Sequence, residues 1–296
     1  MRPFRTSSPR VAALSPSTIP TVALTIAGSD SGGGAGVQAD VRTLHQWGVH
    51  GVVAVTAVTA QNTVGVQRVH AMEPNLVAAQ IASVAVDLAP RAVKSGMLGT
   101  AEIVAAVAAS IRRFRLGPYV LDPVTVSTSG DELLAPDAVA ELRGSLLPLA
   151  AVVTPNLPEA ALLTGREVAS PGQMADAARA LVEMGAGAAL VTGGHLPGTE
   201  VLDLYWDGKS ELAYRGPRLG AGDVHGGGCT LSAAIAAALA RGAEVRQAVA
   251  AARRWVRSAI ATAPELGAGA NPVNHFAPPP SLAHPPGAPP PAGSAE

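Results

Sequence analysis

The sequence predicts an α/β protein with a mostly parallel central sheet and helices on both of its faces. Short runs rich in Val, Ile and Ala alternate along the chain with longer Ala-rich segments of helical periodicity. This alternation is typical of parallel strands that are joined by helical crossovers. With 296 residues, of which 48% are hydrophobic and 15% charged, the chain is long and apolar enough for one large domain.

Strands and helices are predicted in a regular order. β-branched residues dominate six runs that we predict to be buried strands: 21–27, 51–60, 91–97, 119–124, 150–156 and 188–194. Apolar residues recur every three or four positions in the longer segments, which predicts helices over 37–48, 75–88, 100–114, 136–148, 157–165, 172–185, 230–242 and 244–263.

The two ends differ from the middle of the chain. Residues 1–20 carry Arg, Ser and Pro without an acid, and residues 277–296 form a Pro-rich stretch of low complexity. Neither can pack into a core, so we expect disordered ends around a folded domain over residues 21–276. A transit peptide is the alternative for the first segment, but that segment lacks an amphipathic run.

Composition argues against several classes of partner. The formal net charge is −1 and the isoelectric point is near 6.7, so the chain has no electrostatic footprint for nucleic acid or an anionic membrane. No stretch is apolar for long enough to suggest a membrane span. The single cysteine, Cys229, cannot form an internal disulfide, which favours the reducing cytoplasm.

Polar or glycine residues follow each of the first five predicted strands. The runs are AGSDSGGGAG, AQNT, GMLG, DPV and TPNLPEA. Ligands of parallel sheets bind beyond the carboxyl ends of the strands, so these residues predict a shared pocket at one rim. Any one run could be turn chemistry alone, and TPNLPE is also a good helix entry.

The first glycine run, SDSGGGAGVQAD at residues 29–40, leads into a predicted helix. Bare glycine backbone at a helix N-terminus suits close approach to a ligand, because N–H groups and the positive end of the helix dipole point there. An ordinary strand-to-helix turn is the alternative.

The second glycine run, DVHGGGCTLSAAIAAALARG, precedes a long Ala-rich helix. The N–H groups of four residues are predicted to form a cradle for an oxyanion or a transferring phosphoryl group: Gly226, Gly227, Gly228 and Cys229. No Lys-Ser or Lys-Thr follows these glycines, and the first run lacks the GxGxxG spacing. A P-loop NTPase and a Rossmann dehydrogenase are therefore disfavoured.

Seven segments together resemble one known family. IAGSDSGGGAGVQAD, AVTAVTAQNT, KSGMLGT, VLDPV, TPNLPEAALLTG, GGHLPG and HGGGCTLSAAIAAAL are similar, in the same order, to the hydroxymethylpyrimidine/phosphomethylpyrimidine kinases of thiamine biosynthesis. The resemblance implies a ribokinase-like three-layer sandwich. It also implies an enzyme that uses ATP and Mg²⁺ to phosphorylate 4-amino-5-hydroxymethyl-2-methylpyrimidine and then its monophosphate, and that forms a homodimer.

The resemblance also assigns a pyrimidine site. Gln61 of AQNT is similar to the family's ring-recognising glutamine, whose amide can donate and accept hydrogen bonds at once. By the same resemblance, Gly28 approaches the ring through its backbone and Asp40 contacts its hydroxymethyl or amino side. Met97 and Val124 are implied as apolar walls.

Other residues are implied for the nucleotide and its metal. Asp122 of LDPV and Glu159 of NLPEA resemble the family's magnesium-side acids, and Mg²⁺ beside ATP needs only one or two carboxylates. Thr192 and Gly194 of VTGGH are implied as ATP-binding residues. Taken alone, Asp122 could equally cap the turn before Pro123.

Cys229 directly precedes TLSAAIAA, as the family's cysteine does. A thiol at a helix N-terminus has its thiolate favoured, so we expect Cys229 to accept the proton of the substrate hydroxymethyl group. A small hydrophobe that closes the loop is the alternative. GAGD at 220–223 matches the base motif of ribokinase-like sugar kinases in letters, but His225 and three glycines separate Asp223 from the predicted helix.

Three cationic positions of the family are missing from this chain. Thr192 stands in VTGGH where the family has VKGGH, Thr128 stands in VSTSG for VAKSG, and GAGANP replaces GKGHGP. Their loss weakens neutralisation of the triphosphate unless other cations compensate, and the candidates are Lys94, Lys209, Arg215 and Arg218. A pyridoxal-type kinase and a non-catalytic pyrimidine-binding protein stay open as alternatives.

Overall fold

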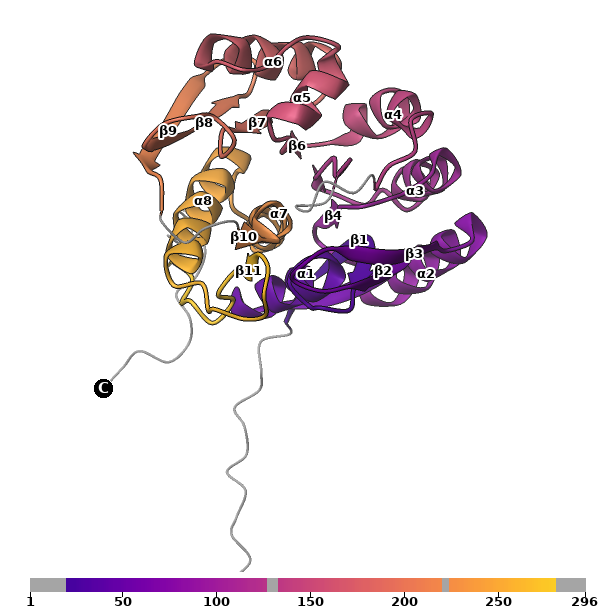
Figure 1. The fold of residues 1–296 in the computed structure, drawn as a ribbon. Helices are drawn as coiled ribbons and strands as arrows, with labels where there is room; N and C mark the ends of the chain where they lie inside the picture. Colours follow the sequence, from indigo (N-terminus) through magenta and orange to yellow (C-terminus); the bar gives the residue numbers. More distant parts are fainter. Residues whose placement is uncertain (1–19, 127–132, 220–223, 281–296) are drawn as a thin grey trace, which may run out of the picture.

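A nine-stranded sheet forms the centre of the protein (Figure 1), in the order β3-β2-β1-β4-β5-β6-β7-β8-β9. The structure is a computed structural model that describes residues 20–126, 133–219 and 224–280. The strands of the sheet are β1 (Thr21–Asp30), β2 (Val49–Gln61), β3 (Val66–Ala71), β4 (Val93–Ser95), β5 (Tyr119–Leu121), β6 (Val152–Val153), β7 (Ala189–Thr192), β8 (Glu200–Trp206) and β9 (Glu211–Pro217). A separate two-stranded sheet pairs β10 (Val224–His225) with β11 (Asn271–Pro272).

The six predicted strands are confirmed as the parallel centre of this sheet, where β2, β1, β4, β5, β6 and β7 pair in parallel. Three further strands, β3, β8 and β9, pair antiparallel at the two edges. Sequence analysis did not find these edge strands. In β9 exposed and half-buried residues alternate, a pattern without the apolar run that marks a buried strand.

Helices cover both faces of the sheet, as predicted. One face carries α1 (Gly36–Gln46), α7 (Gly227–Ala240) and α8 (Val245–Ala261), and their apolar side chains share one core cluster. The other face carries α2 (Pro74–Leu88), α3 (Ala101–Phe114), α4 (Ala138–Glu141), α5 (Leu157–Thr164) and α6 (Pro171–Glu183). No helix of the described ranges is long and apolar enough to cross a membrane.

The predicted helix over 136–148 is broken. It forms α4, a π turn over Leu142–Leu146 and a 3₁₀ turn over Leu147–Leu149. Gly144 lies in the π turn and Pro148 in the 3₁₀ turn. Because glycine favours flexible backbone and proline lacks an N–H donor, both residues interrupt a regular α-helix.

A C-terminal segment, residues 263–277, runs back over the first half of the fold after α8. β11 pairs with β10, and the Ala270 N–H donates to the Thr63 carbonyl, at 2.9 Å. The Ala277 carbonyl accepts from the side chains of Gln46, at 3.1 Å, and Trp255, at 2.8 Å. Packing thus continues one residue past Phe276, while the ends at 1–19 and 281–296, for which disorder is expected, lie outside the described residues.

Candidate active site

The predicted anion loop, residues 226–229, forms the start of α7. Gly226 is the N-cap residue, with a φ of 81°, and α7 begins at Gly227. No described side chain caps this end, whereas Thr100 and Asn156 cap α3 and α5. An uncapped helix start leaves N–H groups for an anion, so the local geometry suits the predicted cradle.

The two glycine loops pack directly against each other. A Cβ atom on Gly226 would lie 1.9 Å from the carbonyl oxygen of Gly34, and one on Gly34 would lie 2.4 Å from Cδ2 of His225. Both distances are shorter than any non-bonded contact, so a side chain at either position would clash. Glycine at these positions therefore allows the first loop, residues 31–35, to close onto the anion loop.

The Asp30 carboxylate accepts hydrogen bonds from the N–H groups of the first loop. It accepts from Gly32, at 2.8 Å, Gly34, at 3.0 Å, and Ala35, at 2.8 Å. Burial alone would raise the pKa of Asp30, but hydrogen bonds from His225 and from the N–H groups of Ala35 and Gly32 hold it below its ordinary value. The expectation that these N–H groups face a ligand is therefore wrong, because they stabilise the loop itself.

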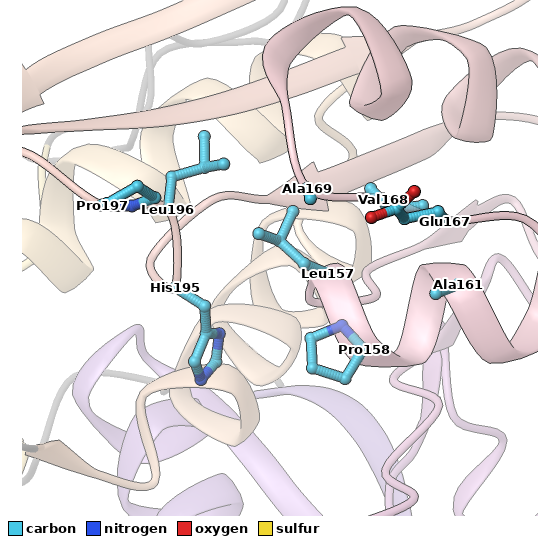
Figure 2. A pocket seen from close by; sticks show the side chains of 9 residues that line it. All are labelled: Leu157, Pro158, Ala161, Glu167, Val168, Ala169, His195, Leu196 and Pro197. Atoms are coloured by element: carbon cyan, nitrogen blue, oxygen red, sulfur yellow. The ribbon is translucent and has the colours of Figure 1, made fainter.

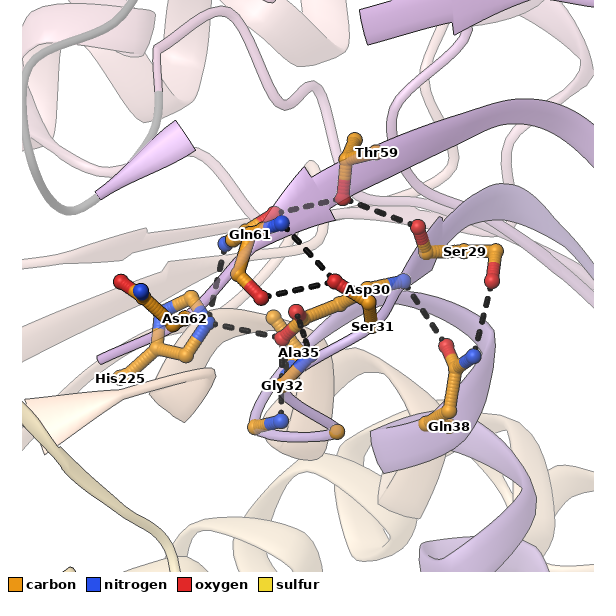
Figure 3. A network of polar contacts seen from close by, with 12 residues as sticks. Ser29, Asp30, Ser31, Gly32, Ala35, Gln38, Thr59, Gln61, Asn62 and His225 are labelled. Atoms are coloured by element: carbon orange, nitrogen blue, oxygen red, sulfur yellow. Dashed lines mark hydrogen bonds and ion pairs between the residues drawn. The ribbon is translucent and has the colours of Figure 1, made fainter. Parts of the chain in front are cut away.

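His225 joins both loops to the predicted ring-recognising glutamine (Figure 3). Its Nε2 lies 3.0 Å from Oδ2 of Asp30 and 3.1 Å from the amide nitrogen of Gln61. Since His225 directly precedes Gly226, the Gln61 side chain lies beside the anion loop. This role of His225 was not predicted from the sequence, although a histidine at the start of a glycine run is the signal that points to it.

Gln61 is held by further contacts. The Ser31 hydroxyl donates to its carbonyl, at 2.7 Å, and accepts from its N–H, at 2.8 Å. Its side-chain oxygen lies 3.0 Å from Oγ1 of Thr59. The residue is half-buried and its position is fixed before any ligand binds.

Three other predicted ring residues lie at the carboxyl ends of neighbouring strands. A Cβ atom on Gly28 would lie 3.0 Å from Sδ of Met97, so the structure brings these two residues together. Val124 is half-buried, and its N–H donates to the carbonyl of Asp122, at 2.9 Å. Their contact with a ring stays a prediction.

Asp40, the fifth predicted ring residue, lies in α1 and is buried. It is 0% exposed, each of its carboxylate oxygens lies 2.9 Å from Nζ of Lys94, and the Thr25 hydroxyl donates to it at 2.5 Å. A carboxylate with no accessible surface cannot meet a substrate unless the core opens. The expected direct contact of Asp40 with the substrate is therefore wrong, since its partners are Lys94 and Thr25.

Lys94 is the centre of a buried charge cluster. Besides Asp40, its Nζ lies 3.8 Å from Oδ2 of Asp122. Burial alone would lower the pKa of Lys94, but the charges of Asp40, Cys229 and Asp122 raise it above its ordinary value. Lys94 is thus a fixed positive charge between the anion loop and the two aspartates, and sequence analysis named it only as a candidate cation.

Asp122 and Glu159, the predicted magnesium-side acids, are both buried near the anion loop. A Cβ atom on Gly228 would lie 4.0 Å from Oδ1 of Asp122, and Ser232 of α7 donates to Oδ2 at 2.9 Å. Burial, with the charge of Asp122 added, raises the pKa of Glu159 to about 8. Two carboxylates that repel each other are a donor set that a hard cation such as Mg²⁺ would relieve.

The metal would need nucleotide oxygens as well. In the described part of the chain, no group of three or more His, Cys, Asp or Glu side chains is placed to hold a metal ion. Mg²⁺ commonly uses one or two protein carboxylates together with substrate phosphates, so Asp122 and Glu159 fit that role.

The Cys229 thiol is half-buried in the third position of α7. Burial raises its pKa to about 12, with Asp122 and Asp40 adding to the rise, against the opposing charge of Lys94. The expected thiolate is therefore not favoured in the unliganded protein. The physical reason is that desolvation and two nearby carboxylates outweigh the helix terminus and the lysine.

The predicted nucleotide residues lie at the end of β7. The Thr192 N–H donates to the carbonyl of Pro155, at 2.9 Å, and the Gly193 N–H donates to Oδ1 of Asp203, at 3.0 Å. Asp203 is itself paired with Arg253 of α8, at 2.6 Å. This buried pair fixes the loop on which Gly194 sits.

Of the four candidate cations, Lys94 belongs to the buried cluster described above, and the other three lie elsewhere. Arg218 donates to the carbonyls of Gly194, Leu196 and Gly198, which braces the loop after β7. Arg215 pairs with Glu200 on the surface, at 3.5 Å, and Lys209 is exposed in the turn between β8 and β9. Thr128 and the motif at 220–223 lie outside the described residues.

A separate pocket of about 360 Å³ opens between α5 and the loop after β7 (Figure 2). It is mostly apolar and is lined by Leu157, Pro158, Ala161, Glu167, Val168, Ala169, His195, Leu196 and Pro197. None of the residues predicted for the ring or for phosphoryl transfer lines it. The predicted site is therefore the cluster around Gln61 and the anion loop, and this pocket is distinct from it.

Comparisons with known proteins find similar chains over nearly the whole folded part. The profile of one family, described as phosphomethylpyrimidine kinase, matches residues 30–274. A protein of Rhizobium meliloti named hydroxymethylpyrimidine/phosphomethylpyrimidine kinase is 52% identical over 258 residues, which are 86% of this chain and 97% of the relative. A protein of the same name from Mycobacterium tuberculosis is 50% identical over 88% of this chain and 95% of its own length.

Solved structures show the same fold. Bacillus subtilis pyridoxal kinase, solved as an ADP complex, superposes with a TM-score of 0.82 at 36% identity, over 87% of this chain and 98% of that one. Clostridium difficile phosphomethylpyrimidine kinase superposes with a TM-score of 0.72 at 38% identity, over 81% of this chain and 99% of that one.

Proposed function

The chain belongs to the phosphomethylpyrimidine kinase family, and we propose that it carries out that family's reaction between its two glycine loops. It is a ribokinase-like phosphotransferase that uses ATP to phosphorylate 4-amino-5-hydroxymethyl-2-methylpyrimidine and then its monophosphate, in thiamine diphosphate biosynthesis.

One observation supports this location above the others. His225 contacts Gln61 at 3.1 Å and directly precedes the anion loop, so a ring bound by Gln61 has its substituents near the N–H groups of residues 226–229. Phosphoryl transfer depends mainly on positioning and on charge stabilisation, and both are built into this arrangement. ATP would supply the phosphoryl group there.

The residues divide the work as follows in our proposal. Gln61 binds the ring edge, while Gly28, Met97 and Val124 surround the ring. The start of α7 stabilises the oxygens of the phosphoryl group in transit. Thr192 and Gly194 support the nucleotide on a loop that Asp203 and Arg218 keep rigid, as described above. The two glycine loops position both substrates.

Mg²⁺ would neutralise phosphate charge beside Asp122 and Glu159. The proposal is supported by the burial of both carboxylates and by the raised pKa of Glu159, which burial and the charge of Asp122 cause. Lys94 neutralises the opposite side of Asp122, at 3.8 Å.

Cys229 has two candidate roles. As a base it would take the hydroxymethyl proton, which requires the thiolate to form once substrates are bound, with Lys94 as the stabilising charge. As a loop-closing residue it would only fill space between α7 and the charge cluster. The raised pKa of the Cys229 thiol supports the second role.

An ADP-release assay with three substrates tests the function. We expect turnover with the hydroxymethylpyrimidine and with its monophosphate, and weaker turnover with pyridoxal, which is included because solved pyridoxal kinases share the fold. Preference for pyridoxal would make the chain a pyridoxal-type kinase. Calorimetric binding of the pyrimidine without ADP release would make it a binding protein.

We also propose a homodimer in the cytoplasm. The edge around β3 and α2 exposes several large apolar side chains: Val64, Val69, Leu76 and Val86, exposed by 65%, 43%, 50% and 74%. Apolar side chains exposed to this degree are available for contact with a second copy. Light scattering on the purified protein should give twice the mass of the chain, and Val86→Glu should shift it toward the monomer.

A further inference from the structure

His225 and Gln61 make a contact whose chemistry is constrained by Asp30. Nε2 of the histidine lies 3.0 Å from the carboxylate and 3.1 Å from the glutamine amide. An ionised carboxylate can only accept hydrogen bonds, and the hydrogen bonds to Asp30 hold its pKa below the ordinary value. Nε2 must therefore carry a hydrogen, which it directs toward Asp30.

That hydrogen decides how the Gln61 amide is arranged. A ring nitrogen that bears a hydrogen cannot accept another from an NH₂ group, so the partner that suits it is the amide oxygen. A half turn of the amide exchanges its oxygen and nitrogen at nearly the same positions. The oxygen then faces His225 and the NH₂ group faces Oγ1 of Thr59.

Thr59 suits this orientation. Its hydroxyl donates to the carbonyl of Ser29, at 3.0 Å, so its oxygen is left to accept from the NH₂ group of Gln61. The single Nε2 hydrogen of His225 is then shared between Oδ2 of Asp30 and the amide oxygen of Gln61, while the Thr59 hydroxyl donates to Ser29 and accepts from the Gln61 NH₂ group. The opposite orientation would set two donors against each other at His225.

We propose that His225 is a specificity-determining residue that acts through Gln61, by fixing which end of the Gln61 amide accepts and which donates. The proposal rests on the function proposed above. A 4-aminopyrimidine presents an amino donor beside a ring-nitrogen acceptor, whereas its 4-oxo analogue presents the two in reversed order. An amide that cannot turn accepts one order and rejects the other, because the rejected ring leaves polar groups unpaired.

The test compares kcat/KM for the 4-amino substrate with that for its 4-oxo analogue. We expect His225→Leu, which removes the ring N–H, to lower the amino-over-oxo ratio at least tenfold, since the amide becomes free to turn. His225→Gln can place an N–H near the same position, and we expect it to keep the ratio within about threefold of the wild type. A loss equal for both substrates in His225→Leu would overturn the proposal.

Two further variants keep the test independent of loop folding. Thr59→Val removes the partner at the other end of the amide and should also lower the ratio; its hydroxyl meets the first glycine run only at the Ser29 carbonyl, before the first loop at residues 31–35. Thr43→Val is the matched control, because Thr43 is a buried threonine of α1 whose hydroxyl has no hydrogen-bond partner among the described residues. If His225→Leu does not fold, an unchanged ratio in Thr59→Val overturns the proposal. A wild type that phosphorylates neither pyrimidine would refute the proposed function instead.

Discussion

Gln61 is the residue that we propose to recognise the ring, and neighbouring residues hold it in place. Ser31 fixes its main chain, while Thr59 and His225 fix its side chain. Little conformational entropy is then lost when a ring binds, so most of the energy of the polar contacts is available for affinity.

Replacing Gln61 with Ala should raise the KM for the pyrimidine at least tenfold. A tenfold change corresponds to about 1.4 kcal/mol, the size expected for a lost polar contact to a buried ring. Steady-state kinetics with varied pyrimidine and saturating ATP measure the effect, and the KM for ATP is the internal control. An unchanged KM for the pyrimidine would remove Gln61 from the site.

Replacing Cys229 with Ser should slow turnover about 100-fold, a typical contribution of a general base, and leave the affinity for the pyrimidine nearly intact. Serine is close in size, so the loop should keep its shape. Calorimetry measures the affinity and ADP release measures kcat. If affinity and kcat fall together, Cys229 closes the loop and is not the base; if neither changes, it has no essential role.

For individual residues, the sequence predicted which side chains lie near the site better than it predicted what they contact. Gly28 and Met97 were expected around one ring, and the structure brings them together. Asp40 was misplaced, because its fully buried pairing with Lys94 joins β4 to α1 and depends on the tertiary fold. His225 was overlooked for the same reason: its partners Asp30 and Gln61 are distant in the chain.

Among the elements, the contact of the two glycine loops is the most sensitive to a single methyl group. We expect Gly226→Ala to destabilise the protein by several kcal/mol, because its Cβ would lie 1.9 Å from the Gly34 carbonyl and its φ of 81° disfavours alanine. Urea denaturation gives the free energy of unfolding. Gly227→Ala is the matched control for stability, since a Cβ there meets nothing within 4 Å. Equal stabilities of the two variants would contradict this account.

The elements themselves were predictable where burial is complete. The six parallel strands are apolar runs, and α3, α5 and α6 begin at the caps Thr100, Asn156 and Ser170. Strand β9 escaped detection because exposed and half-buried residues alternate along it, and β8 because the acid Asp203 interrupts its buried apolar run. The break after α4 was missed, because the apolar spacing continues through Gly144 and Pro148.

For the whole molecule, acid should loosen the packing of the C-terminal segment. Burial, with the charge of Arg42, lowers the pKa of His275 to about 4, and its ring contacts Thr230 of α7 at 3.0 Å. The unfolded chain binds this proton near pH 6.5, whereas the folded chain binds it only near pH 4. Stability from this group is therefore complete above about pH 6.5 and is lost as the pH falls toward 4.

Comparing unfolding at pH 7 and pH 5 tests this prediction. His275→Gln should lose about 2 kcal/mol less than the wild type between these pH values, at 1.36 kcal/mol for each pH unit below about 6.5. His45→Gln, at an exposed position of α1, should keep the wild-type dependence. A wild-type dependence in His275→Gln would show that other groups control acid stability.

The overall arrangement could be read from sequence because alternating apolar runs and helices leave few ways to cover a parallel sheet. The site could be predicted only in part. The order of the strands predicts that the residues after them gather at one rim of the sheet. The contact between the two glycine loops could not be predicted, because it depends on which distant segments touch.

The pairing of β10 with β11 has a consequence for biosynthesis. Residues 224–225 leave the ribosome well before residues 271–272, which are their only strand partners among the described residues. A nascent chain that has completed α7 therefore still lacks the strand that pairs with the two residues just before the proposed anion loop. We expect this loop to reach its final position only after residues 271–272 have been synthesised.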